Sequence, residues 1–201
     1  MRSRAAAAVL AREGFQKAYS MEGGIHAWKG LRATGAPEAG MAYFEPGKSP
    51  EELIALAWML EEGSRKFYTE MGKEERSPET AALLRDLADD EKKHQSSLFK
   101  IYQKRSGKDS DPGFPQSLLS LEPGVDYLEG GIVLEKALEW AQGKGPKDIL
   151  EFSLSLEVNS IDLYIKMERR VEGKETKEVF QALSNQERNH LKRLTAALEK
   201  S

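Results

Sequence analysis

Two Glu-x-x-His sequences are the residues of this chain best suited to chemistry. Glu91 precedes His94 by three positions, and Glu187 precedes His190 by the same step. Positions three apart on an α-helix project from one face, so each pair can offer a carboxylate oxygen and an imidazole nitrogen to one ion. A single such pair is common on a solvated helix surface, and the second copy makes the pattern informative.

Each pair is preceded by a further glutamate at a fixed distance. Glu61 lies thirty positions before Glu91, and Glu157 lies thirty positions before Glu187, so the two halves form an internal repeat. All four acids, and the two histidines, fall within stripes that are otherwise apolar at helical spacing. Unpaired carboxylates in a core are costly and repel one another, and no Lys or Arg occupies these stripes. Two divalent metal ions are the expected compensation.

The predicted ligand set combines four carboxylates with two imidazoles. Its members are Glu61, Glu91, His94, Glu157, Glu187 and His190. Such a set suits a di-iron or di-manganese site in a helical bundle, with zinc as a less natural alternative for a redox-active pair. The chain has no cysteine, which removes disulfides, iron–sulfur clusters and thiolate zinc sites within it.

The elements that must position these ligands are predicted to be long helices. Ser49-Pro50 and Ser77-Pro78 each combine an N-cap residue with proline at the first helical position. The expected helices span about residues 50–71, 78–105, 131–142, 146–171 and 176–199. A long crossover separates two tightly turned helix pairs, which predicts an all-α, ferritin-like four-helix bundle of two antiparallel hairpins.

Composition limits the other classes of function. The chain has 201 residues, enough for one good core and a small second unit, and its formal charge of -3 comes from interspersed acids and bases. Neither a nucleic-acid nor an anionic-membrane partner is implied. The apolar runs are shorter than a bilayer span and no secretory signal is evident, so a soluble, cytoplasmic protein is expected.

Residues 50–201 resemble the ferritin-like superfamily, in particular its rubrerythrin-like branch. The resemblance rests on Glu61 followed by Phe67-Tyr68, LADDEKKH (87–94), Glu157 followed by Tyr164, and NQERNH (185–190). It implies a non-haem di-iron centre that reacts with peroxide or dioxygen, in a cytoplasmic and usually dimeric protein.

Two departures from the rubrerythrin pattern affect what the resemblance implies. Rubrerythrins often carry a four-cysteine rubredoxin domain, so this cysteine-free chain would need an external electron donor such as a rubredoxin-like protein. Their third helix often adds a further glutamate, whereas Leu154 and Ser160 stand one turn to either side of Glu157. Metal binding is therefore implied more strongly than peroxidase activity. The alternatives are a ferroxidase or iron-handling protein, and a non-catalytic dimerisation scaffold for a sulfur-handling partner.

Tyr68 and Tyr164 each lie seven positions after a predicted ligand glutamate and on its helix face. Either hydroxyl is placed to hydrogen-bond a ligand carboxylate, or the ring to pass an electron to the centre. The alternative is that both are core aromatics with no role in the chemistry.

The N-terminal segment, residues 1–40, resembles the last third of a rhodanese domain through RSRAAAAVL and GGIHAWKG. A linker over 41–49 would join this α/β segment to the bundle. The rhodanese nucleophile is a cysteine, which this chain lacks, so sulfurtransferase activity is not expected. The segment is interpreted either as part of a longer rhodanese fusion or as a retained remnant, and His26 within it as a surface or packing residue.

Overall fold

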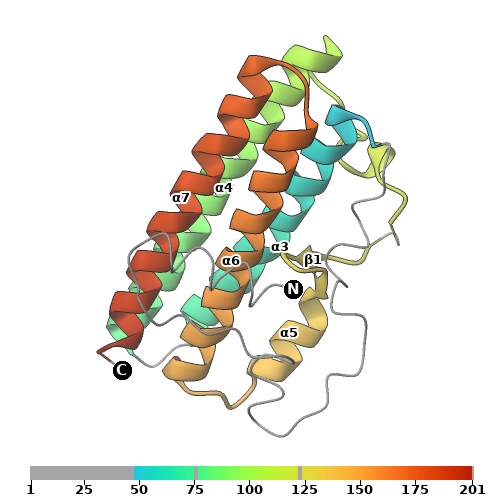
Figure 1. Cartoon of the computed structure of the whole chain (residues 1–201). Helices are drawn as coiled ribbons and strands as arrows, with labels where there is room; N and C mark the ends of the chain where they lie inside the picture. The colour runs from blue at the N-terminus through green and yellow to red at the C-terminus, as the bar shows by residue number, and fades with distance from the viewer. Residues whose placement is uncertain (1–47, 75–76, 122–123, 201) are drawn as a thin grey trace, which may run out of the picture. The chain divides into compact units, whose positions relative to one another are not determined.

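The computed structural model describes residues 48–74, 77–121 and 124–200, and these form a helical bundle with a small β-hairpin. The predicted rhodanese-like segment, with His26, lies outside the described residues. The four long helices are α3 (Pro50–Glu74), α4 (Pro78–Ser106), α6 (Pro146–Arg170) and α7 (Lys174–Leu198). Helix α3 packs along α4, and α6 packs along α7 (Figure 1). The predicted ferritin-like bundle of two helical hairpins is confirmed.

The helix starts follow the capping signals in the sequence. The hydroxyl of Ser49 accepts a hydrogen bond from the backbone N–H of Glu52 at 3.2 Å, and the Glu52 carboxylate accepts one from the Ser49 N–H at 2.7 Å. This reciprocal capping box satisfies two N–H groups that the first turn leaves unpaired. Ser77 caps α4 by accepting from the N–H of Thr80 at 3.3 Å.

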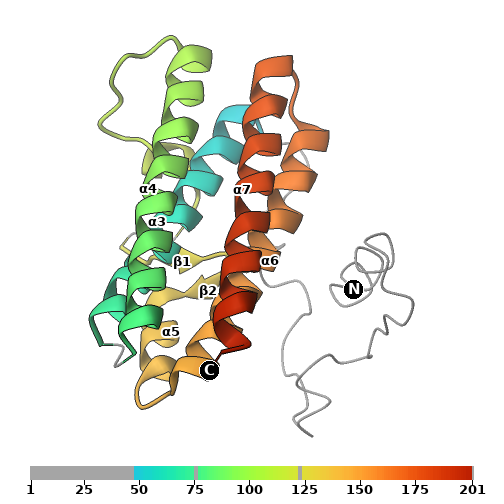
Figure 2. The ribbon, with the colours of Figure 1, turned by 90° about the vertical axis from the view of Figure 1, so that its left-hand side faces the viewer.

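The described residues of the crossover between the two hairpins form four short elements. They are the 3-10 turn η2 (Gln116–Leu118), β1 (Tyr127–Leu128), β2 (Ile132–Val133) and helix α5 (Leu134–Ala141). Strand β1 pairs antiparallel with β2, with Tyr127 opposite Val133 (Figure 2). The prediction that a helix begins at residue 131 is therefore wrong. Gly131 has a φ of 74° in the hairpin turn, and the next two residues are in β2.

The hairpin lies between helices of both pairs. A side chain at Gly63 of α3 would overlap the carbonyl oxygen of Tyr127, so glycine allows β1 to approach the helix backbone. From α6, the amide of Asn159 donates a 3.4 Å hydrogen bond to the backbone oxygen of Glu129. The crossover is thus held at the level where α3 and α6 carry Glu61 and Glu157.

The apolar core is divided into two clusters by a polar layer. One cluster includes Leu60 and Leu98, and the other includes Leu87 and Leu194. On α4, Leu87 and Leu98 lie on opposite sides of the Glu91–His94 pair, so the polar residues interrupt the apolar stripe as predicted.

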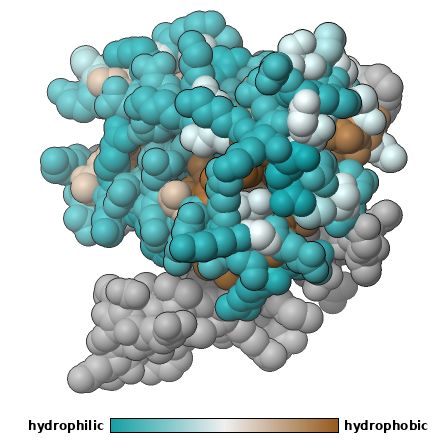
Figure 3. Space-filling view, turned by 90° about the horizontal axis from the view of Figure 1, so that it is seen from above, coloured by the Kyte–Doolittle hydropathy of each residue, from teal (hydrophilic) through white to brown (hydrophobic). Residues whose placement is uncertain are grey.

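The face of the bundle seen in Figure 3 is mainly hydrophilic, with apolar atoms visible in the gaps between polar side chains. Among the described residues, none of the helices combines the length and the apolar character needed to cross a lipid bilayer.

Candidate metal centre

All six predicted ligand side chains lie in the polar layer between the two apolar clusters. Each residue is buried, with between 0% and 3% of its surface exposed. They come from all four long helices, one position each from α3 and α6 and a Glu-x-x-His pair from each of α4 and α7. The helical stripes of the sequence therefore converge at one place in the core.

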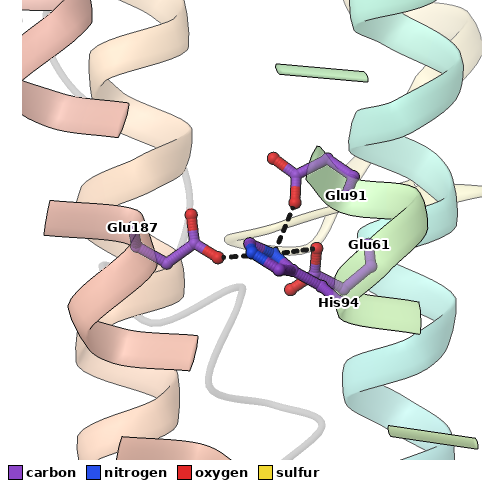
Figure 4. Close-up of side chains that lie close together, drawn as sticks. All are labelled: Glu61, Glu91, His94 and Glu187. Carbon is purple, nitrogen blue, oxygen red and sulfur yellow. Dashed lines mark hydrogen bonds and ion pairs between the residues drawn. The ribbon is translucent and has the colours of Figure 1, made fainter. Parts of the chain in front are cut away.

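The first half of the site is centred on the imidazole of His94. Its Nδ1 lies 3.2 Å from Oε2 of Glu61, 2.9 Å from Oε2 of Glu91 and 3.0 Å from Oε1 of Glu187. Figure 4 shows these three carboxylates, from three different helices, pointing at one ring nitrogen. Four ligand atoms, one from each of these residues, lie within 4.8 Å of one another, which is close enough to share one ion.

The second half repeats this geometry around His190. Its Nδ1 lies 3.2 Å from Oε2 of Glu157, 3.0 Å from Oε2 of Glu187 and 3.6 Å from Oε1 of Glu91. These four residues also place one ligand atom each within 4.8 Å of the others. The rings of the two histidines are stacked, with centroids 5.5 Å apart and planes 21° from parallel.

Two carboxylates are common to both halves. Glu91 and Glu187 direct different oxygens toward the two imidazoles, whereas Glu61 and Glu157 each belong to one half. This arrangement can hold two ions with Glu91 and Glu187 between them and one glutamate at each end.

Burial and mutual repulsion govern the acids of the site. Burial, with the nearby charge of Glu187, raises the pKa of Glu157 to about 8. Burial, with the charge of Glu91, also raises the pKa of Glu61 well above its ordinary value. Burial and the repulsion of Glu91 disfavour charge on Glu187, but its close polar contacts with Glu157 and the two histidines prevail, so its pKa is lowered. Crowded carboxylates of this kind require positive charge nearby.

The imidazoles supply that charge as protons. Burial disfavours the charged ring of His190, but its hydrogen bond with Glu157 and its ion pair with Glu187 prevail and raise its pKa to about 11. Burial also opposes charge on His94, yet the carboxylate of Glu61 raises the pKa of that ring. Protons and metal ions can balance the same buried carboxylates, so binding of metal is expected to release protons.

Buried carboxylate oxygens without a hydrogen-bond partner indicate whether these residues fit a metal ion. Among the described residues, several buried carboxylate oxygens have no hydrogen-bond partner, namely Oε1 of Glu61, Oε2 of Glu91 and both oxygens of Glu187. Two of these sit at ion-pair distance from His94 without hydrogen-bond geometry. Buried polar atoms are rarely left unpaired, so oxygens gathered around two imidazoles fit an ion that coordinates them.

The two tyrosines singled out in the sequence, Tyr68 and Tyr164, differ in the hydrogen bonding of their hydroxyls. The hydroxyl of Tyr68 donates a 2.5 Å hydrogen bond to Oε1 of Glu157 across the bundle. Burial and the charge of Glu157 raise the pKa of Tyr68 well above its ordinary value, so the phenol keeps its proton. Tyr164 is equally buried, but its hydroxyl has no hydrogen-bond partner within the described parts of the chain.

A fifth buried carboxylate, that of Glu129, lies beside the site and was missed by sequence reasoning. Glu129, in the turn after β1, is 2% exposed, and its Oε2 accepts a hydrogen bond from the hydroxyl of Ser64, one turn after Glu61. Burial, with the charge of Glu91, raises the pKa of Glu129 well above its ordinary value. A buried acid is recognisable in a sequence when it interrupts a helical apolar stripe, whereas Glu129-Gly130-Gly131 at a turn carries no periodic signal. The crossover thus adds one buried acid to the surroundings of the site, although Glu129 belongs to neither of the two four-residue groups.

The fold and the site together define a class of protein, the four-helix bundles that gather carboxylates and imidazoles into a buried metal-binding core. The Rubrerythrin family model matches residues 52–142 and 148–201, well over half of the chain. The chain therefore belongs to the Rubrerythrin family, and its buried cluster is compatible with a di-iron site.

One solved structure adds to this assignment. It is titled "Hypothetical Protein Pfu-1136390-001 From Pyrococcus furiosus" and is 27% identical in sequence, with a TM-score of 0.58. The alignment covers 82% of this chain and 95% of that one. The comparison with curated proteins found no match. The family and the fold are thus shared with known proteins, whereas the activity has to be argued from the site.

Proposed function

We propose that the six buried residues hold two iron ions and that the centre reduces peroxide, or dioxygen, with electrons from an external donor. The observation that supports this most directly is the pair of four-residue groups sharing Glu91 and Glu187. Each group offers three carboxylates and one imidazole, a donor set that suits iron. When bound, the iron pair would supply electrons by cycling between diferrous and diferric states.

The residues of this chain would position and insulate that centre. Tyr68 holds Oε1 of Glu157 through its hydroxyl, so Oε2 of that glutamate faces His190. Glu129, whose raised pKa favours the protonated acid, is held near the site by Ser64. The apolar clusters on both sides, with Leu60 and Leu87 among their members, exclude water from the polar layer.

Peroxide reduction consumes two electrons and two protons for each molecule of peroxide and yields two molecules of water. The cysteine-free chain provides no iron–sulfur or rubredoxin-type centre, so the electrons are assigned to a separate donor such as a rubredoxin-like protein. A homodimer, which the family resemblance implies, belongs to the same proposal.

Turnover distinguishes this function from iron storage or oxidation of iron as a substrate. The test supplies iron-loaded protein with a reduced rubredoxin and hydrogen peroxide under anaerobic conditions, and follows the absorbance of the rubredoxin. Oxidation of many equivalents of donor per protein supports the proposal. If oxidation stops once the bound ferrous iron has been oxidised, and resumes only when more ferrous iron is added, then iron is the substrate.

The matched control replaces Glu151, an exposed acid of α6, with alanine. This variant is expected to turn over like the parent, whereas Glu91→Ala should lose nearly all turnover. Equal rates in the parent and Glu91→Ala would show that the buried cluster takes no part in the reaction.

A further inference from the structure

Asp90 of α4 faces the outer nitrogen of one of the two site histidines. Its Oδ2 lies 3.4 Å from Nε2 of His190, an ion-pair distance, while Nδ1 of the same ring points inward at Glu157 and Glu187. The Asp90 carboxylate therefore favours a proton on Nε2 of His190. The lone pair of Nδ1 is then directed toward the interior of the bundle. A carboxylate behind a metal-binding histidine orients the ring and makes it a better ligand.

The Asp90 carboxylate is itself held by two basic side chains. Arg193, one turn after His190 on α7, donates a 3.0 Å hydrogen bond to Oδ2 of Asp90 and a 2.9 Å hydrogen bond to Asp86. Lys93 donates to Oδ1 of Asp90 at 2.6 Å. Arg193 therefore links α7 to α4 at the level of the site and fixes the oxygen that faces His190.

The internal repeat gives His94 no equivalent of the Asp90 and Arg193 side chains that lie beside His190. Every ligand in the first half has its equivalent 96 positions later, as in 91 + 96 = 187 and 94 + 96 = 190. The equivalent of Asp90 is residue 186, which is glutamine, and residue 97, the equivalent of Arg193, is serine. Within the described parts of the chain, the carboxylates in ion-pair contact with His94 all face its Nδ1, and none faces its Nε2.

We propose that Asp90, oriented by Arg193, makes the two metal positions unequal, so that the position at His190 and Glu157 fills before the position at His94 and Glu61. Asp90 acts as a positioning residue because it touches the ligand ring and no metal. The inference rests on the proposed two-metal site, and it adds an order of binding that the six ligands alone do not specify.

The order of filling can be followed with cobalt(II), which is added anaerobically to metal-stripped full-length protein while its visible absorption is recorded. The parent is expected to bind two ions per chain in two resolved steps. Asp90→Ala should weaken the first step about 10- to 100-fold, the usual effect of removing a partner behind a ligand, and leave the second step nearly unchanged. Asp90→Asn keeps an acceptor without the charge and should fall between the two.

Three further variants separate positioning from loss of structure. Asp89→Ala removes the exposed neighbouring acid and should bind like the parent. Arg193→Gln should weaken the first step by less than Asp90→Ala does. Gln186→Asp places a carboxylate at the equivalent position and should strengthen the second step, a gain that misfolding cannot produce.

The outcomes discriminate between this inference and the function on which it depends. Two ions that bind the parent with equal affinity, or steps that Asp90→Ala leaves unchanged, would overturn the unequal positions while leaving the two-metal site intact. A parent that binds well under one cobalt per chain would overturn both. Circular dichroism of each stripped variant confirms that the bundle has folded before the titration is interpreted.

Discussion

Buried protons at the site link the stability of the metal-stripped protein to pH. The raised pKa of Glu157, about 8, means that the native state keeps a proton that the unfolded chain loses above its ordinary value of 4.5. The pKa of His190 is likewise raised, to about 11, so above pH 6.5 the native state also keeps a proton on this ring that the unfolded chain loses. Stability from both groups is therefore present at low pH and is lost as pH rises through the folded pKa values.

The free energy of unfolding of stripped protein is accordingly expected to fall between about pH 6 and pH 9, by about 1.4 kcal/mol per pH unit for each extra proton held. Denaturant unfolding at a series of pH values measures this slope. Stabilisation by added metal should increase over the same range, because the ligands must release protons. A stripped protein that gains stability from pH 6 to 9 would contradict the assignment of these protons.

The two site tyrosines provide a matched pair of substitutions. Tyr68→Phe removes the 2.5 Å hydrogen bond to Glu157 and leaves a buried carboxyl oxygen unpaired, so it is expected to cost about 1–3 kcal/mol. Tyr164→Phe removes a hydroxyl with no hydrogen-bond partner among the described residues and should be near neutral. Denaturant unfolding of the two variants makes the comparison, and equal losses would show that the Tyr68 hydrogen bond contributes nothing.

At the scale of elements, the approach of the β-hairpin to α3 depends on Gly63. Gly63→Ala improves helix propensity by about 1 kcal/mol, yet its methyl group would overlap the carbonyl oxygen of Tyr127. A net loss of about 1–3 kcal/mol is expected because β1 must move away. Gly145→Ser, at the N-cap of α6, is the control and should be neutral or stabilising, because an added Cβ there would meet no non-neighbouring atom of the described residues within 4 Å.

Thermal unfolding of Gly63→Ala beside Gly145→Ser measures the difference. A Gly63→Ala protein as stable as its parent would mean that the hairpin does not need this contact. The variant also reports on Glu129, because the same hairpin turn positions that carboxylate beside Ser64.

The long helices could be predicted from the sequence because their caps and stripes are local signals. Ser49 and Ser77 mark starts that the hydrogen bonds confirm. The hairpin could not be predicted, since strands of two residues have no periodicity and owe their pairing to contacts with α3. Glu129 was missed for the same reason.

At the scale of the whole molecule, the convergence of the six ligands could be predicted because the chain repeats itself. Acids recurring at matched positions in two halves, each within an apolar stripe, have few arrangements that bury them together. The sharing of Glu91 and Glu187 between the halves depends on how the helix pairs face each other, which spacing alone does not specify.

Metal content tests the central claim most directly. The protein is purified anaerobically, supplied with iron, freed of excess iron and analysed for iron per chain. The double variant Glu91→Ala, Glu187→Ala and the control Glu151→Ala are treated in the same way. The account predicts about two irons per chain in the parent and the control, and a loss of most of them in the double variant, which lacks both shared carboxylates. A parent that retains well under one iron per chain, or a double variant as fully loaded as the parent, would contradict it.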